Sequence, residues 1–161
     1  MARTSSRLQM ELRQSKPFAT PIEECFLALA KTADVLLRTL DRRLQPYDLS
    51  HQQYNVLRIL RGAGPEGIAT LAIADRLIES TPGMTRMLDR MEKKDLVRRQ
   101  RCPHDRRQVL CFLTPKSEQL LTTLDPVVKS VGDACFEQIQ PADMESMIEA
   151  MERIREQAER L

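Results

Sequence analysis

The chain has 161 residues, of which 42% are hydrophobic and 30% charged, with a formal net charge of +2 at pH 7. This length fits one domain, or one small domain joined to an oligomerisation element, and the apolar fraction can fill a modest core. No apolar run approaches the roughly 18 residues that a membrane-spanning helix needs, so we expect no membrane partner. The cysteines at positions 25, 102, 111 and 135 form no Cys-x-x-Cys pair, which predicts reduced thiols and a cytoplasmic location.

Charge is distributed unevenly along the chain. Residues 84–107 carry nine basic and four acidic side chains, whereas residues 137–161 carry seven acidic and three basic ones. A basic middle beside an acidic end suggests that the middle contacts a polyanion. Solvated helix faces would give the same counts, so charge alone leaves both interpretations open.

The first predicted element is a long helix that follows a flexible or weakly helical arm at residues 1–19. Thr20 can cap the helix and Pro21 suits its first turn. An apolar stripe with spacings of three and four continues to Leu44, and the helix should end before Pro46. Few glycines and aromatic residues likewise favour helices over sheets.

A second helix is predicted to begin at a capping box formed by Ser50 and Gln53. Leu49 and Tyr54 have the spacing of a hydrophobic staple across the same helix start. The glycine-rich stretch 62–67 ends the helix.

Two short helices then form a helix-turn-helix candidate. The first is predicted over about residues 70–78, and the second is opened by the cap Thr81, with Pro82 as its first helical residue. Small and hydroxyl residues at the start of a recognition helix suit phosphate contacts, and long arginines can reach base edges. The residues of this helix that we expect to contact DNA are Thr81, Pro82, Gly83, Thr85, Arg86 and Arg90.

Residues 96–113 are predicted to form a β-hairpin whose turn, at 102–107, is basic. Ile68 is a candidate for a further short strand. Arg106 and Arg107 at the hairpin tip can place guanidinium groups in a narrow minor groove, where the negative potential is enhanced.

Two more helices are expected after Thr114 and near Pro141, and Pro126 should kink or interrupt the first of them. Their apolar stripes suit either a dimer interface or the chain's own core, and the size limits of small cores favour the dimer. The predicted fold is mainly α with a small β-hairpin, a winged helix-turn-helix with flanking dimerisation helices. Its expected parts are a flexible arm (1–19), an N-terminal dimerisation helix (20–48), a winged helix-turn-helix DNA-binding domain (49–114) and C-terminal dimerisation helices (115–161).

In these features the chain resembles the MarR (multiple antibiotic resistance regulator) family over roughly residues 20–161. Family members usually have glycine at the positions of Asp95 and Ser117, and often in the turn that is Ile78-Glu79 here. The residues that carry the resemblance are Thr81–Lys94, Leu96-Val97, Pro103–Arg107 and Leu113-Thr114.

The resemblance implies a homodimeric transcriptional regulator, most often a repressor, that binds a pseudo-palindromic operator in double-stranded DNA. The recognition helix would enter the major groove and the hairpin, or wing, the minor groove. On this resemblance Asp105 orients the wing through neighbouring arginines, and Arg107 contacts the minor groove.

The resemblance also implies a site for a small anionic or phenolic effector between the dimerisation helices and the DNA-binding lobe. This site would lie near Phe26, Tyr47, His51 and Tyr54. Ordinary structural roles remain open for three of these residues: Tyr54 as the staple, His51 as a first-turn surface residue and Phe26 as part of the core.

Cys25 is similar in position to the thiol of the peroxide-sensing branch of the family, so a redox-sensing regulator is an alternative function. A sensing thiol needs exposure and a lowered pKa, and two adjacent glutamates oppose the latter, so we expect a buried and inert Cys25.

Cys102, His104 and Cys111 lack a zinc-ligand spacing and a fourth partner, so no metal is expected.

Sequence motifs of enzymes are absent: the chain has no glycine-rich phosphate loop, His-Glu-x-x-His helix or Gly-x-Ser-x-Gly elbow, and it has two histidines. We therefore expect neither an enzyme nor a cofactor.

A helical protein-interaction module that does not bind DNA is the other alternative, but it does not explain why arginines collect on a hairpin beside a capped helix.

Overall fold

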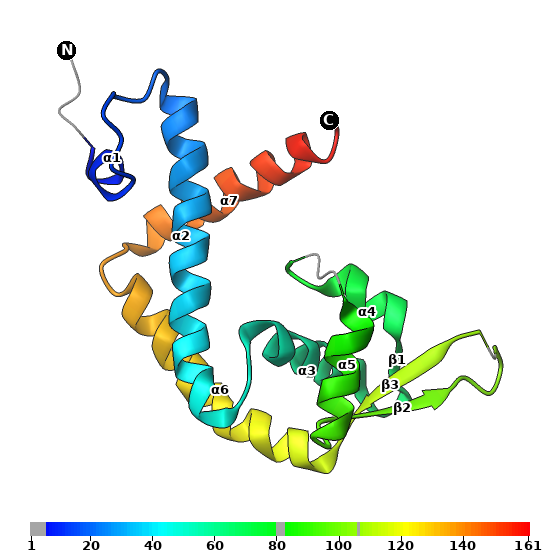
Figure 1. Ribbon diagram of the computed structural model, residues 1–161. Coiled ribbons are helices and arrows are strands. Elements are labelled where there is room, and N and C mark those ends of the chain that lie inside the picture. Colours follow the sequence, from blue (N-terminus) through cyan, green and yellow to red (C-terminus); the bar gives the residue numbers. More distant parts are fainter. Residues whose placement is uncertain (1–5, 80–82, 106) are drawn as a thin grey trace.

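The computed structural model describes residues 6–79, 83–105 and 107–161. Within these ranges the chain is mainly helical and carries one three-stranded antiparallel sheet (Figure 1), the predicted winged helix-turn-helix architecture. The helices are α1 (Arg7–Glu11), α2 (Pro21–Leu44), α3 (His51–Ala63), α4 (Thr70–Arg76), α5 (Met84–Lys93), α6 (Pro115–Phe136) and α7 (Pro141–Ala158), the 3-10 turns are η1 (Gln45–Tyr47) and η2 (Gly64–Glu66), and the strands are β1 (Ile68–Ala69), β2 (Val97–Arg101) and β3 (Val109–Leu113).

Helix α3 begins at the predicted capping box. The Ser50 side chain accepts a hydrogen bond from the backbone N–H of Gln53, and the Gln53 side chain accepts one from the backbone N–H of Ser50. Leu49 and Tyr54 are both buried at this helix start, as their staple spacing predicts. The local sequence therefore sets where the winged helix-turn-helix lobe begins.

The sheet joins the predicted hairpin to the short strand at Ile68. Its order is β1-β3-β2, with Cys111 of the central strand opposite Ile68 on one side and Arg99 on the other. The β2–β3 hairpin extends away from the helices as a wing (Figure 1). Buried side chains from α3, α4, α5 and the sheet form one core, so the wing and α5 are held on a common base.

Helix α5 starts later than predicted. Gly83 takes the cap position with a left-handed backbone (φ +90°), and Met84 is the first helical residue. Thr81 and Pro82, predicted as cap and first helical residue, lie outside the described residues. Helix α4 likewise ends at Arg76, earlier than the sequence indicated. The left-handed glycine explains the late start of α5, because a right-handed helix cannot continue through such a residue.

Pro126 lies inside α6, which continues from Pro115 to Phe136 without the interruption that was one of the two predicted outcomes. The helix changes direction along its length (Figure 1). A proline removes one helical hydrogen bond and crowds the preceding turn, so a bend in a continuous helix is the milder of its usual effects.

The outer helices keep much of their apolar surface exposed in the single chain. All of α2 and α7 is described, and Leu44 is the one buried residue that they contribute. The chain's own core therefore covers only part of these stripes. Among the described residues no helix is both long and apolar enough to cross a membrane. The exposed large apolar side chains on α2 and α7 are Ile22, Phe26, Leu29, Val35, Met147, Ile148 and Ile154.

Candidate nucleic-acid interface

Helix α5 presents one apolar and one polar face. Met87, Leu88 and Met91 are buried against the core. Thr85, together with the two arginines at positions 86 and 90, is exposed on the other side. An amphipathic helix anchored in this way leaves the side chains of a predicted recognition helix available to a ligand outside the lobe.

The end of α5 is closed by a left-handed residue. Asp95 has φ +57°, and its N–H bonds to the carbonyl of Glu92 at 2.9 Å. The N–H of Leu96 bonds to the carbonyl of Met91 at 2.9 Å, which completes a Schellman motif. Asp95 therefore adopts the conformation that glycine usually supplies, because a short polar residue tolerates it better than most.

Arg99 of β2 ties the wing to α5. Its Nε donates to Glu92 at 2.9 Å, and a terminal nitrogen donates to Glu92 and to Asp89, each at 2.6 Å. The hydrogen bond from Arg99 lowers the pKa of Glu92 below its ordinary value. This guanidinium thus holds the wing to the helix, a role that the count of basic residues did not reveal.

The tip of the wing is ordered by Asp105. Its carboxylate accepts hydrogen bonds from the backbone N–H of Arg107 at 3.0 Å and from the side-chain amide of Gln108 at 3.1 Å. Within the described part of the wing, these are the side-chain contacts of Asp105, and no arginine guanidinium contributes. The side chain of Arg107 is exposed, whereas Arg106 lies outside the described residues.

One surface depression joins the wing to α5. Thr85 of α5 and Arg107 of the wing both line it, although they are far apart in the sequence. Leu71, at the start of α4, lines the same depression and is 79% exposed. Sequence reasoning missed Leu71, because a leucine within a short amphipathic helix is usually buried against the core.

A bidentate ion pair joins the winged helix-turn-helix lobe to α6. The two terminal nitrogens of Arg61 on α3 lie 2.8 and 2.9 Å from the carboxylate oxygens of Asp125 on α6. The hydrogen bonds from Arg61 lower the pKa of Asp125. Bidentate geometry fixes orientation as well as distance, so α6 is held at a defined angle to the lobe.

A cleft of about 270 Å³ lies between α2, α3 and residues 77–79. His51 and Tyr54, two of the residues predicted for an effector site, line it. Phe26 and Tyr47 do not: Phe26 is 71% exposed near the start of α2, and Tyr47 packs against the core. These two residues lie outside this cleft because α2 contributes to it through Leu37 and Leu40, in its C-terminal half.

Sequence reasoning also missed several residues of this cleft. Arg58 donates a hydrogen bond to the Tyr54 hydroxyl at 3.1 Å, and Glu79 contacts the ring of His51 at 2.8 Å. The one sequence signal at position 79 is that a glutamate stands in a turn that often contains glycine in the MarR family. The remaining lining residues are Leu37, Leu40, Gln52, Asn55, Leu77 and Ile78.

The cysteines occupy different environments. Cys25 is exposed in the single chain, so the expected burial is wrong: this part of α2 packs against no core of its own. Cys111 is buried, and burial raises the pKa of its thiol. Among the described residues no group of three His, Cys, Asp or Glu side chains is arranged to hold a metal ion.

Comparisons with known proteins identify this architecture. The model of the MarR family matches residues 49–109, the segment from the α3 cap to the wing. A MarR transcription factor from Planctomyces limnophilus is 35% identical, covers 84% of this chain and 98% of its own, and has a TM-score of 0.65.

Two structures from Streptomyces coelicolor share the fold at 24% identity. AbsC, a MarR family transcriptional regulator, covers 91% of this chain and 100% of its own, with a TM-score of 0.78. Sco3205, a MarR family regulator solved in complex with DNA, covers 89% of this chain and 91% of its own, with a TM-score of 0.74. Together with the family model and the 35% identical factor, this likeness leads to one conclusion: the chain belongs to the MarR family of transcriptional regulators.

Proposed function

We propose that the chain is a sequence-specific DNA-binding regulator that acts as a homodimer, probing the major groove with α5 and the minor groove with the wing. The observation that carries the proposal is the shared depression between α5 and the wing, lined by Thr85 and Arg107. Arg86 and Arg90 are exposed on the same helix as Thr85. Guanidinium groups on two elements with a common base suit simultaneous contacts to two grooves.

We propose that all the residues predicted from the sequence to contact DNA do so. For Thr81, Pro82 and Arg106, which lie outside the described residues, this proposal rests on their sequence positions alone. Gly83 and Asp105 have a local role, at the cap of α5 and in the wing turn. The complex of Sco3205 with DNA supports this assignment by its similar fold.

The homodimer would be formed by α2, α6 and α7. The support for this dimer is the exposed apolar surface on α2 and α7, where Phe26 is 71% exposed and Ile148 is 48% exposed. Exposed large apolar side chains on long helices are typical of interfaces between subunits. A two-fold axis through these helices would pair two winged lobes, which suits a pseudo-palindromic operator. The division into an arm, dimerisation helices and a DNA-binding domain belongs to the same proposal.

Repression and control by a small effector complete the proposal. The cleft beside His51 and Tyr54 combines apolar walls with polar groups, including the cation of Arg58. Such a lining suits a small anionic or phenolic molecule. Because the cleft lies between α2 and the helix-turn-helix, its occupant would contact both parts of the protomer.

The test is a fluorescence-anisotropy titration of the purified protein into a labelled duplex from upstream of its own gene, with a scrambled duplex as reference. A specific regulator is expected to bind at roughly 10⁻⁸ M or tighter, about a thousandfold tighter than the scrambled duplex. Affinity should fall steeply between two salt concentrations, because phosphate contacts release counterions. Analytical ultracentrifugation of the same sample should give a dimer.

Each unfavourable result has a distinct meaning. Equal, weak binding to both duplexes would place the operator elsewhere in the genome, and a genome-wide selection of bound fragments would then decide. Absence of binding at either salt concentration would favour the protein-interaction module. A monomer in solution would contradict the dimer.

A redox-sensing regulator is a second candidate, favoured by the exposure of Cys25 in the single chain. Treatment with hydrogen peroxide should then release wild-type protein from the operator but leave the Cys25→Ser variant bound. The Cys135→Ser variant is a matched control, because Cys135 is also exposed. Equal sensitivity of wild type and Cys25→Ser would exclude this candidate.

A further inference from the structure

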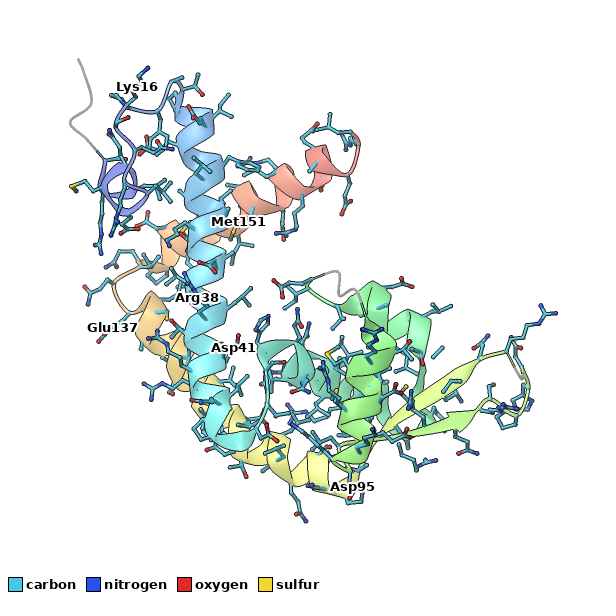
Figure 2. All side chains as sticks on the ribbon, viewed as in Figure 1. Lys16, Arg38, Asp41, Asp95, Glu137 and Met151 are labelled. Carbon is cyan, nitrogen blue, oxygen red and sulfur yellow. The ribbon has the colours of Figure 1, made fainter. Side chains whose placement is uncertain are left out.

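His51 lies between two carboxylates from two other parts of the chain. Its Nδ1 is 2.8 Å from an oxygen of Asp41 on α2, and its Nε2 is 2.8 Å from an oxygen of Glu79, between α4 and α5. The backbone N–H of His51 donates to the other oxygen of Asp41 at 2.7 Å. Asp41 is labelled on α2, where this helix passes the start of α3 (Figure 2). One imidazole therefore connects an outer helix to the segment that precedes α5.

The chemistry of these contacts requires a particular protonation state. A neutral imidazole has one N–H and one lone pair, whereas an ionised carboxylate can only accept hydrogen bonds. If both carboxylates are ionised, both ring nitrogens must carry protons for the two contacts to be hydrogen bonds. The His51 side chain is 19% exposed, so water compensates little for a lost partner.

The surroundings of His51 favour its charged form. Burial by itself lowers its pKa, but the hydrogen bonds to Glu79 and Asp41 outweigh this effect and raise the pKa above the ordinary 6.5. The hydrogen bonds that Glu79 accepts from His51 and Gln52 lower the pKa of Glu79. Two independent partners thus favour the same state, an imidazolium between two carboxylates.

The other charged groups near the cleft have partners of their own. On α2, Arg38 pairs with Asp34 and Arg42 donates to Thr39. On α3, Arg58 donates to the hydroxyl of Tyr54, and both residues line the cleft. The charges that face the ring from α2 and from residues 77–79 are accordingly those of Asp41 and Glu79.

We propose that protonated His51 is a link that holds residues 77–79 against α2, and that loss of its proton releases these residues. Without the proton, one carboxylate would face a lone pair of the ring, and the contact would become repulsive. Glu79 lies four residues before Gly83, the cap of α5. The link would therefore act on the start of the recognition helix.

The effect on DNA binding rests on the function proposed above. A segment already held in place loses less conformational freedom when α5 binds, so the protonated form should bind DNA more tightly. Affinity should then fall as pH rises through the pKa of His51. The link itself exists whether or not the chain binds DNA, and the two statements can be tested separately.

The first experiment is an NMR pH titration of the two ring nitrogens of His51, identified by the His51→Gln variant, which leaves His104 as the other histidine. We expect both nitrogens to be protonated at pH values where a free imidazole is about half neutral or more. In Glu79→Gln the pKa of His51 should fall, whereas in Glu66→Gln, an exposed position away from His51, it should not change. A neutral single tautomer at about pH 6.5, or an unchanged pKa in Glu79→Gln, would overturn the proposal.

The second experiment measures operator affinity against pH for three proteins. Wild type and Glu66→Gln should lose affinity at least about fivefold between about pH 6 and about pH 9. In Glu79→Gln, the new amide can donate to a neutral Nε2, so the contact should persist and most of this pH dependence should disappear. Since His104 is present in all three proteins, the difference between them isolates the link.

The two experiments separate the possible failures. If no duplex is bound, the proposed function fails, and the titration still decides whether the link exists. If the link exists but wild type and Glu79→Gln respond equally to pH, its proposed effect on DNA binding is wrong. Glu79→Ala, which removes both kinds of contact, should bind weakly throughout the pH range.

Discussion

The hydroxyl of Thr114, the cap of α6, donates a 2.8 Å hydrogen bond to the carbonyl oxygen of Asp95, the left-handed residue that ends α5. Figure 2 labels Asp95 at this junction, where α5 ends beside the start of α6. The buried hydroxyl of Ser117, one turn into α6, donates to the next carbonyl, that of Leu96. The end of the proposed recognition helix is thus tied directly to the start of α6.

Ser117→Ala should destabilise the protein by about 1–3 kcal/mol, because it leaves the buried carbonyl of Leu96 without this donor. Urea denaturation followed by circular dichroism measures the change in the free energy of unfolding. Ser130→Ala is a matched control on the same helix, since the exposed Ser130 also donates to a backbone carbonyl but can be replaced there by water. Equal effects of the two substitutions would contradict the role given to Ser117.

Asp95→Gly should stabilise the protein by up to about 1 kcal/mol, because glycine adopts a positive φ without steric cost. Removing a negative charge from the C-terminal end of α5 acts in the same direction. Asp48→Gly is the control: Asp48 also has a positive φ of 54°, but it forms an ion pair with Lys94 at 2.7 Å that the substitution removes. Thermal denaturation should therefore show a larger increase in melting temperature for Asp95→Gly than for Asp48→Gly.

Arg107→Ala should weaken operator binding by about 1–3 kcal/mol, the size of a good groove contact, and leave the dimer intact. The Arg107 side chain is exposed at the wing, and the variant keeps the hydrogen bond from the backbone N–H of residue 107 to Asp105. Anisotropy titration measures the affinity, and ultracentrifugation checks the assembly. Arg153→Ala, which removes the same charge from exposed α7, should bind as wild type does. Unchanged affinity in Arg107→Ala would remove the wing from the proposed interface.

Glu92→Gln should lower the melting temperature at neutral pH, because Arg99 loses a charged partner at both contacts. The pKa of Glu92 is lowered in the folded protein, so its contribution is present above the ordinary value of 4.5 and is lost as pH falls through the folded pKa. The melting temperatures of wild type and variant should therefore converge in acid. A difference that stays constant down to low pH would show that the charge of Glu92 is not what stabilises the wing.

Much of the architecture could be predicted because its signals are local. The residues of the capping box, Ser50 and Gln53, are three positions apart, and those of the staple, Leu49 and Tyr54, are five apart. Apolar periodicity and a turn-rich basic segment were enough to predict the outer helices and the wing. Such features depend on backbone preferences and on neighbours within one or two turns, which the sequence states directly.

The partners of charged and apolar side chains were decided by the tertiary structure. His51 meets carboxylates 10 and 28 residues away, and Arg99 turns inward to α5 although it belongs to a basic run. Phe26 shares an apolar stripe with buried Leu44 yet remains exposed, because only the end of α2 reaches the core. Periodicity defines which face of a helix is apolar, but the packing of distant segments determines which part of that face is covered and which charges come within hydrogen-bonding distance.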